Sequence, residues 1–166
     1  MQPSANIIAY IARTEQFSPR AYLDPPHNTA GKYSIGYGHQ IQPNERNLLT
    51  ATLTQAQAQS MLAKDLQYYV NSLNRDLKRP VSQDTFDGLL DFYYNDGTGA
   101  GAKVVQTWNA TGDSTQLANH LKEYVYVHVG GQPQISQNLV ARRGFEASLI
   151  QGLGFVVAEA EKKSTT

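Results

Sequence analysis

Residues 10–24 read YIARTEQFSPRAYLD, and this stretch decides the expected fold and function. Ser4 is expected to cap a helix in which apolar residues recur at helical spacing, and that helix leads to Glu15. Asp24 follows nine residues later, at the end of an expected strand and before a Pro-Pro turn. The stretch therefore predicts a helix followed by a strand, with a carboxylate at the end of each.

Residues 21–39 have the composition of β structure. Aromatic and small residues alternate on both sides of the turn-rich segment PPHNTAGK at 25–32, which predicts a β-hairpin or a small sheet. Ser34 falls in the second of the expected strands.

The rest of the chain predicts helices. Thr54 and Gln57 form a capping box at the start of a long helix over 54–73, and Ser82 caps the next helix, over 83–95. Further helices are expected at 100–111, 114–127 and 137–152, with a loop at 130–136. The chain is thus expected to be an α+β protein, with a small sheet near the N-terminus packed beside a mainly helical lobe.

Composition narrows the class of protein. The length of 166 residues predicts a single domain over 1–166, with a loose tail from about residue 153. No apolar run is long enough to span a membrane, and no signal peptide is expected. Fourteen basic and fourteen acidic residues leave no basic stripe for nucleic acid, and the absence of cysteine excludes disulfides and thiol catalysis.

Three side chains form a candidate catalytic group. Glu15 continues the buried stripe of the first helix and lies at its negative end, and both effects raise the pKa of a carboxyl toward that of a general acid. Each residue alone has a simpler interpretation: a solvated glutamate, a turn-forming aspartate at 24, a packing hydroxyl at 34. Together, an acid, a second carboxylate and a hydroxyl are typical of glycoside hydrolysis.

Other polar residues indicate structural roles. The four histidines show no metal-ligand spacing, so neither a metal site nor a cofactor is expected. Asp84, Asp87 and Asp91 share one helix face and are expected to be solvated. Arg142 and Arg143 are interpreted either as surface charge or as a counter-charge to Glu15.

The order of motifs resembles that of the phage-type lysozymes, glycoside hydrolase family 24. Their signature is a Glu, an Asp nine residues on and then Thr-Ile-Gly-x-Gly-His, which the segment YSIGYGH at 33–39 resembles. The segment FDGLLDFYYNDGTGAG at 86–101 is similar to the family's segment that ends in Phe-Asn-x-Gly, and NLVARRGFEASL at 138–149 is similar to its arginine-rich closing helix. The resemblance covers residues 7–150 and implies a lysozyme-like fold.

The resemblance also implies residue roles. Glu15 would be the general acid, Asp24 the second carboxylate and Ser34 the equivalent of a catalytic threonine, keeping the hydroxyl without the methyl group that restricts it. The residues implied to line the sugar cleft are Gln40, Tyr94 and Asn95. The reaction would be cleavage, without metal or cofactor, of the β-1,4 bond between N-acetylmuramic acid and N-acetylglucosamine in peptidoglycan.

Alternatives to a phage muramidase remain. The same fold could serve as a structural or wall-binding module of a phage particle with little catalysis. A lytic transglycosylase is a third interpretation, which Asp24 disfavours because that reaction needs only the glutamate. The muramidase is expected to be a monomer that stays in the host cytoplasm until it is released to the periplasm or cell wall, or else to be carried on the virion.

One ion pair is predicted from the helix pattern and the implied fold. Asp65 interrupts the apolar stripe of the long helix, and a carboxylate there is costly unless it is paired. The implied fold brings His39 beside it, so an ion pair that raises the pKa of His39 and lowers that of Asp65 is expected. His39 and Asp65 are expected to support the site structurally, and so are Arg142 and Arg143.

Overall fold

The computed structural model describes residues 1–23 and 32–155. Asp24, the expected turn residues 25–31 and most of the expected loose tail, residues 156–166, lie outside the described residues. The chain forms two compact units: residues 8–68, here called the sheet unit, and residues 1–7 with the chain from residue 69 onward, here called the helical unit.

Helix α1 (Ala5–Glu15) starts and ends where the sequence predicts. The backbone N–H of Ile7 donates to the hydroxyl of Ser4 at 3.2 Å, which confirms the cap. Gln16 has a positive φ of 58°, a conformation that cannot continue a right-handed helix. The helix therefore ends at Glu15, and the chain turns directly into the first strand.

The sheet unit contains a three-stranded antiparallel sheet in the order β1–β2–β3. Its strands are β1 (Ser18–Leu23), β2 (Tyr33–Gly36) and β3 (His39–Gln40). Gly36 has a φ of 71°, and a Cβ there would lie 3.2 Å from the Cβ of Ala58. The glycine thus permits both the turn after β2 and close packing of the next helix on the strand.

A 3₁₀ helix, η1 (Arg46–Leu49), precedes the long helix α2 (Gln55–Asp76). The predicted capping box is present: the N–H of Thr54 donates to the side chain of Gln57 at 2.8 Å, and the N–H of Gln57 donates to the Thr54 hydroxyl at 3.3 Å. The part of α2 in the sheet unit buries Ala58, Leu62 and Leu66.

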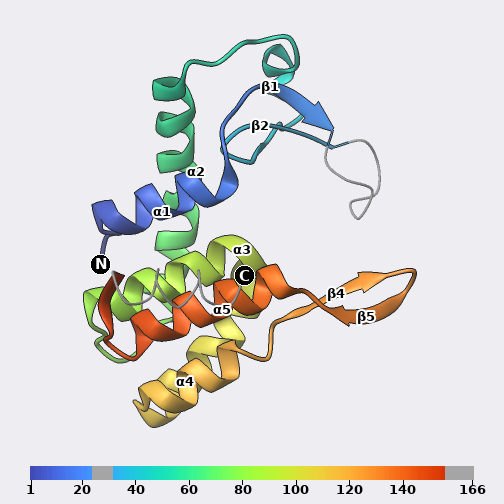
Figure 1. Cartoon of the computed structure of the whole chain (residues 1–166). Coiled ribbons are helices and arrows are strands. Elements are labelled where there is room, and N and C mark those ends of the chain that lie inside the picture. Colours follow the sequence, from blue (N-terminus) through green and yellow to red (C-terminus); the bar gives the residue numbers. More distant parts are fainter. Residues whose placement is uncertain (24–31, 156–166) are drawn as a thin grey trace. The chain divides into compact units, whose positions relative to one another are not determined.

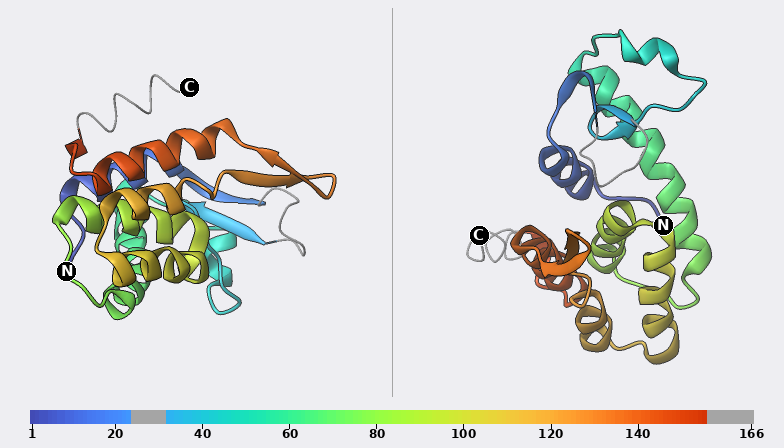
Figure 2. Two further views of the ribbon diagram at one scale, coloured as in Figure 1. Left: turned by 90° about the horizontal axis from the view of Figure 1, so that it is seen from below. Right: turned by 90° about the vertical axis from the view of Figure 1, so that its right-hand side faces the viewer.

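Besides the end of α2, the helical unit contains three helices that pack together: α3 (Gln83–Thr111), α4 (Ser114–Leu121) and α5 (Gln137–Ile150). They pack pairwise against one another, as two views show (Figures 1 and 2). Sequence patterns predict two helices where the structure has α3, and the kink between them is at Gly97, whose φ is 82°. The predicted cap is confirmed, since Ser82 accepts from the N–H of Thr85 at 3.1 Å.

A second hairpin replaces part of an expected helix. The prediction of a helix over 114–127 is wrong after Leu121, because β4 (Tyr126–Val129) pairs with β5 (Gln132–Ile135). Gly130 and Gly131, both with positive φ, form the two-residue turn that suits a tight hairpin. This hairpin projects beyond the helices of its unit (Figure 1).

Within the described residues, no helix combines the length and the apolar character needed to cross a membrane.

Candidate active site

Glu15 is the last residue of α1, as predicted, and its side chain is half-buried. The left-handed residue that follows fixes where the helix ends, so it sets the backbone position from which the Glu15 side chain extends. A helix end supplies the defined backbone position that a catalytic group needs.

Ser34 lies in the middle of the sheet and is only 4% exposed. It is paired with Tyr22 of β1 on one side and with Gln40 of β3 on the other. Because paired residues of neighbouring strands share a face, the three side chains lie on the same face of the sheet. The sheet unit therefore brings Ser34 and Gln40, two of the expected site residues, onto one face of the sheet.

The expectation for Asp24 remains a prediction. The residue follows β1, whose last residue is Leu23, and lies outside the described residues.

The other two expected substrate-binding residues, Tyr94 and Asn95, belong to α3 of the helical unit. The ring of Tyr94 packs edge-on against that of Tyr69, with centroids 5.3 Å apart. The side-chain oxygen of Asn95 accepts a hydrogen bond from Arg143. This bond orients the amide so that its nitrogen points away from Arg143.

His39 forms the predicted contact with Asp65, and also a second contact that was not predicted. Its Nδ1 lies 2.9 Å from Oδ2 of Asp65, and its Nε2 lies 3.0 Å from Oε2 of Glu45. A neutral imidazole would direct a lone pair at one of these carboxylates, so the protonated ring satisfies both. The polar loop 42–45 gave no periodic signal that would have identified Glu45 from the sequence.

Of the two predicted pKa shifts, the one for His39 is confirmed and the one for Asp65 is wrong. Burial lowers the pKa of His39, but hydrogen bonds to Asp65 and Glu45 outweigh it, so the pKa is raised as expected. The expected lowering of the Asp65 pKa is wrong: burial raises it by more than the contact with His39 lowers it. The pKa of Glu45 is lowered, first by the backbone N–H of Gln42 and then by His39.

Arg142 is buried and forms a two-pronged ion pair. Its Nη2 lies 2.7 Å from Oδ1 of Asp91, and its Nε lies 3.0 Å from Oδ2. Two parallel bonds of this kind are the strongest arrangement available to an arginine and a carboxylate. The interpretation of Arg142 as a surface charge is therefore wrong.

Arg143 is even more deeply buried, at 1% exposed, so it is not a surface charge either. It donates to Asp96 and Asn95, and its guanidinium carbon lies 4.6 Å from the centre of the Phe92 ring. Its Nε lies 3.1 Å from Oε2 of the fully buried Glu146, an ion pair with poor hydrogen-bond alignment. Burial raises the pKa of Glu146 well above its ordinary value, although the charge of Arg143 lowers it.

The acidic face expected to be solvated is largely buried. Asp91 is held by Arg142, and Asp87 accepts from the backbone N–H of Ser4 at 3.2 Å and from Gln83 at 2.9 Å. Burial raises the pKa of Asp87, and these donors only partly offset it. The expectation failed because periodicity shows which residues share a face but does not identify partners from distant segments.

Among residues 1–23 and 32–155, no group of histidine, aspartate and glutamate side chains is arranged to hold a metal ion.

Comparisons with known proteins agree with this fold. The family model of phage lysozymes matches residues 12–146. The endolysin of Bacillus phage PZA is 38% identical over 103 residues, covering 60% of this chain and 37% of the relative. The endolysin of Bacillus phage B103 is 31% identical over 147 residues, which cover 86% of this chain and 51% of the relative. This chain therefore spans only about a third to about half of the length of these two relatives.

A solved structure extends the likeness to nearly the whole chain. The endolysin from Escherichia coli O157:H7 phage FAHEc1 is 28% identical and has a TM-score of 0.80. The superposition covers 93% of this chain and 96% of the endolysin chain. This structural match shows that the mostly helical chain with its small antiparallel sheet has a lysozyme-like α+β fold. The chain belongs to the phage lysozyme family, which confirms the resemblance inferred from its motifs.

Proposed function

We propose that the protein is a muramidase that hydrolyses the β-1,4 bond between N-acetylmuramic acid and N-acetylglucosamine in peptidoglycan. The observation that carries this proposal is membership of the phage lysozyme family together with the retained acid and hydroxyl of the sheet unit. Glu15 ends α1, and Ser34 lies in the central strand of the sheet.

In the proposed reaction, Glu15 donates its proton to the glycosidic oxygen as that bond breaks. Water attacks the anomeric carbon, and Asp24 accepts the proton that the water loses. The hydroxyl of Ser34 accepts a hydrogen bond from the attacking water and orients it. Every atom in this scheme comes from the substrate, water and side chains, so neither metal nor cofactor is needed.

Several further features belong to the same proposal. The chain is proposed to act as a single catalytic domain over 1–166 and as a monomer, with peptidoglycan rather than nucleic acid as its partner. It would serve host-cell lysis, staying in the host cytoplasm until its release to the wall, or would act from the virion during entry. A structural or wall-binding module without catalysis is the alternative, and the retained Glu15 and Ser34 favour the enzyme.

Loss of turbidity of cells with a permeabilised outer membrane tests the proposal. Glu15→Gln keeps the shape of the side chain but has no proton to donate, so lysis should fall by about 10²–10⁴-fold while the melting temperature stays within a few degrees. Asp24→Asn should cause a comparable loss. Lysis by the Glu15→Gln variant at the wild-type rate would refute the assignment.

A further inference from the structure

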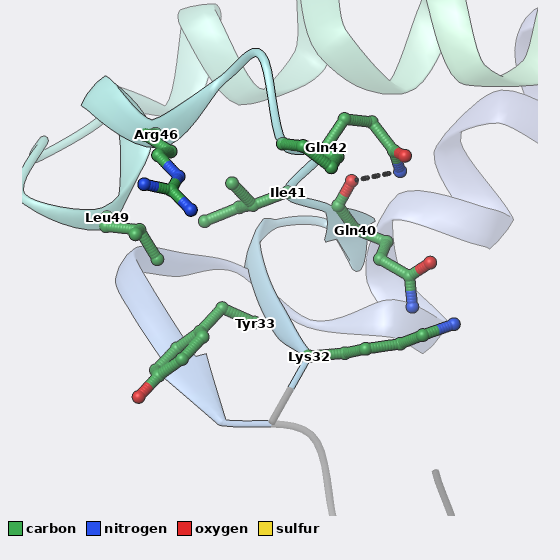
Figure 3. A pocket seen from close by; sticks show the side chains of 8 residues that line it. Lys32, Tyr33, Gln40, Ile41, Gln42, Arg46 and Leu49 are labelled. Atoms are coloured by element: carbon green, nitrogen blue, oxygen red, sulfur yellow. Dashed lines mark hydrogen bonds between the residues drawn. The ribbon is translucent and has the colours of Figure 1, made fainter. Parts of the chain in front are cut away.

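Charged side chains have opposite surroundings in the two units. In the sheet unit, Lys32 and Arg46 line a pocket of about 650 Å³ beside β2 and β3, and both residues are exposed (Figure 3). In the helical unit, Asp91, Arg143 and Glu146 are each 1% exposed or less. Water stabilises the charges in the pocket, whereas the buried groups depend on the partners that the protein itself supplies.

The buried cluster contains more carboxyl groups than cations. Its cations are Arg142 and Arg143 of α5, and its carboxyl groups are Asp91 and Asp96 of α3 and Glu146 of α5. If all of them were ionised, two positive charges would face three negative ones. An uncompensated charge is costly in a buried site, so a proton on one of the carboxyl groups would make the cluster neutral and more stable.

The two aspartates take the well-aligned hydrogen bonds of the arginines. Asp91 receives both prongs of Arg142, at 2.7 and 3.0 Å, and Arg143 donates to Asp96. Burial raises the pKa of Asp96, but the charge and the hydrogen bond of Arg143 oppose that shift, and the side chain is 20% exposed. Charge-assisted bonds of this kind favour the ionised carboxylate, so the two aspartates are the anions that balance the two arginines.

Glu146 lacks comparable bonds. Its side chain is fully buried, and in the part of the chain that the structure describes neither of its carboxyl oxygens accepts a hydrogen bond. Nε of Arg143 lies 3.1 Å from Oε2 with poor alignment, and Nε of Arg142 lies 3.8 Å from Oε1. Because a buried carboxylate without hydrogen bonds is the costliest form of this group, Glu146 is the carboxyl that should carry the proton.

Asp91 is the acceptor for that proton. The carboxyl of Glu146 is within hydrogen-bonding reach of Asp91, and two carboxyl groups can form such a bond only when one of them is protonated. Burial is the largest cause of the raised pKa of Glu146, and the negative charge of Asp91 adds to it. Helix α4 also packs on α5, and its one titratable residue, His120, is bonded to the hydroxyl of Thr107 at 2.7 Å.

We propose that Glu146 is protonated at neutral pH and donates to Asp91, so that one buried proton holds α5 to α3 and is released as the pH rises. Loss of this proton would leave three anions for two cations. It would also draw Arg143 toward Glu146 and away from Asp96 and Asn95, both of which it binds. The helical unit thus contains a pH-sensitive bond whose loss acts on Asn95, a residue implied to line the sugar cleft.

Glu146→Gln tests the inference, because an amide has the shape of the protonated acid and can donate to Asp91 but cannot ionise. Urea unfolding of the wild type and the variant is measured from about pH 5 to about pH 9, above the ordinary pKa of a glutamate. The unfolding equilibrium constant of the wild type should rise relative to that of the variant by up to about tenfold per pH unit. His39 is present in both proteins, so its own titration cancels in this ratio.

Glu123→Gln is the matched control, because Glu123 is an exposed glutamate of the same unit. Its ratio to the wild type should stay constant across the pH range. If Glu146 were instead ionised and paired with Arg143, Glu146→Gln would raise the unfolding constant at neutral pH by about a hundredfold or more. Such a loss, or a constant ratio for Glu146→Gln, would overturn the inference.

A second measurement does not depend on how stable the Glu146→Gln variant is. Carbon NMR of the Glu15→Gln variant, isotopically labelled in its glutamate carboxyl groups, reports the ionisation of each glutamate, and the substitution removes the proposed catalytic acid from the spectrum. One glutamate should keep the chemical shift of a protonated carboxyl at neutral pH. Ionisation of every labelled glutamate at that pH would show that the proposed proton is absent.

Discussion

Nδ1 of His39 lies 2.9 Å from Oδ2 of Asp65, and the same ring reaches Glu45 through its other nitrogen. A single imidazolium therefore joins β3, the middle of α2 and the residue that precedes η1. The cluster therefore adds a polar link between the sheet and the long helix to the close packing of Gly36 against Ala58.

The stability of the protein should depend on pH through this cluster. The raised pKa of His39 means that its contribution is complete below about pH 6.5 and is lost as the pH rises through its folded pKa. The raised pKa of Asp65 acts in the same direction, because the folded protein binds that proton more tightly than the unfolded chain does, so stability falls as the pH rises past the ordinary pKa of an aspartate. Both shifts therefore predict that the contribution of the cluster to stability falls as the pH rises from acid through neutral.

Thermal melts of the wild type and Asp65→Asn across pH 3–9 measure this effect. The difference in stability between the wild type and Asp65→Asn should be most favourable to the wild type in acid and should shrink as the pH rises, because Asp65→Asn removes one of the two shifted groups and the partner that raises the pKa of the other. Glu45→Gln serves as the control and should cost less, because Glu45 is more exposed than Asp65. Parallel stability curves for the wild type and Asp65→Asn would show that the pair contributes nothing.

Substitutions of Ser34 should separate its chemistry from its packing. Ser34→Ala removes the hydroxyl proposed to orient water, whereas Ser34→Thr retains it and adds the methyl group typical of the family. The alanine variant should therefore release muropeptides at least tenfold more slowly than the threonine variant, with purified sacculi as substrate. Equal rates for the two variants would assign Ser34, which is buried, to packing alone.

Arg143 should be essential to the helical unit. Arg143→Met would remove the cation of Asp96 and would leave the buried Glu146 only its longer contact with Arg142, at 3.8 Å; removing one partner of a buried pair typically costs about 3–5 kcal/mol. Urea unfolding should show this loss. Arg75→Met is the control, because Arg75 is 67% exposed and its pair with Asp76 should be worth less than about 1 kcal/mol. Similar losses for the two variants would contradict the role assigned to burial.

Two glycines of α3 should respond oppositely to alanine. A Cβ at Gly101 would overlap the ring of Tyr93, which cannot move freely because its hydroxyl donates to Asp76 at 3.0 Å. A Cβ at Gly99 would meet nothing within 4 Å. Gly101→Ala should therefore destabilise by about 1–3 kcal/mol, and Gly99→Ala should stabilise by up to about 1 kcal/mol. Calorimetric melts of both variants test the pair, and the same sign for both would contradict the packing described for Tyr93.

The sequence alone determined the features that depend on neighbouring residues. The caps at Ser4, Thr54 and Ser82 follow from residues three positions apart, and the structure confirms them. The hairpin at Gly130 and Gly131 was also encoded locally, but the alternating residues before it were interpreted as the end of a helix.

Only the tertiary structure decided which charges are buried and what each one binds. Asp91 and Arg142 are 51 positions apart, and Arg143 and Asn95 are 48 apart, so no local pattern could pair them. The pKa of Asp65 is raised rather than lowered because burial, which depends on the packing of the whole unit, outweighs a contact that the sequence did predict. Periodicity determines which side chains share a face; the free energy of a charge on that face depends on what the rest of the chain places against it.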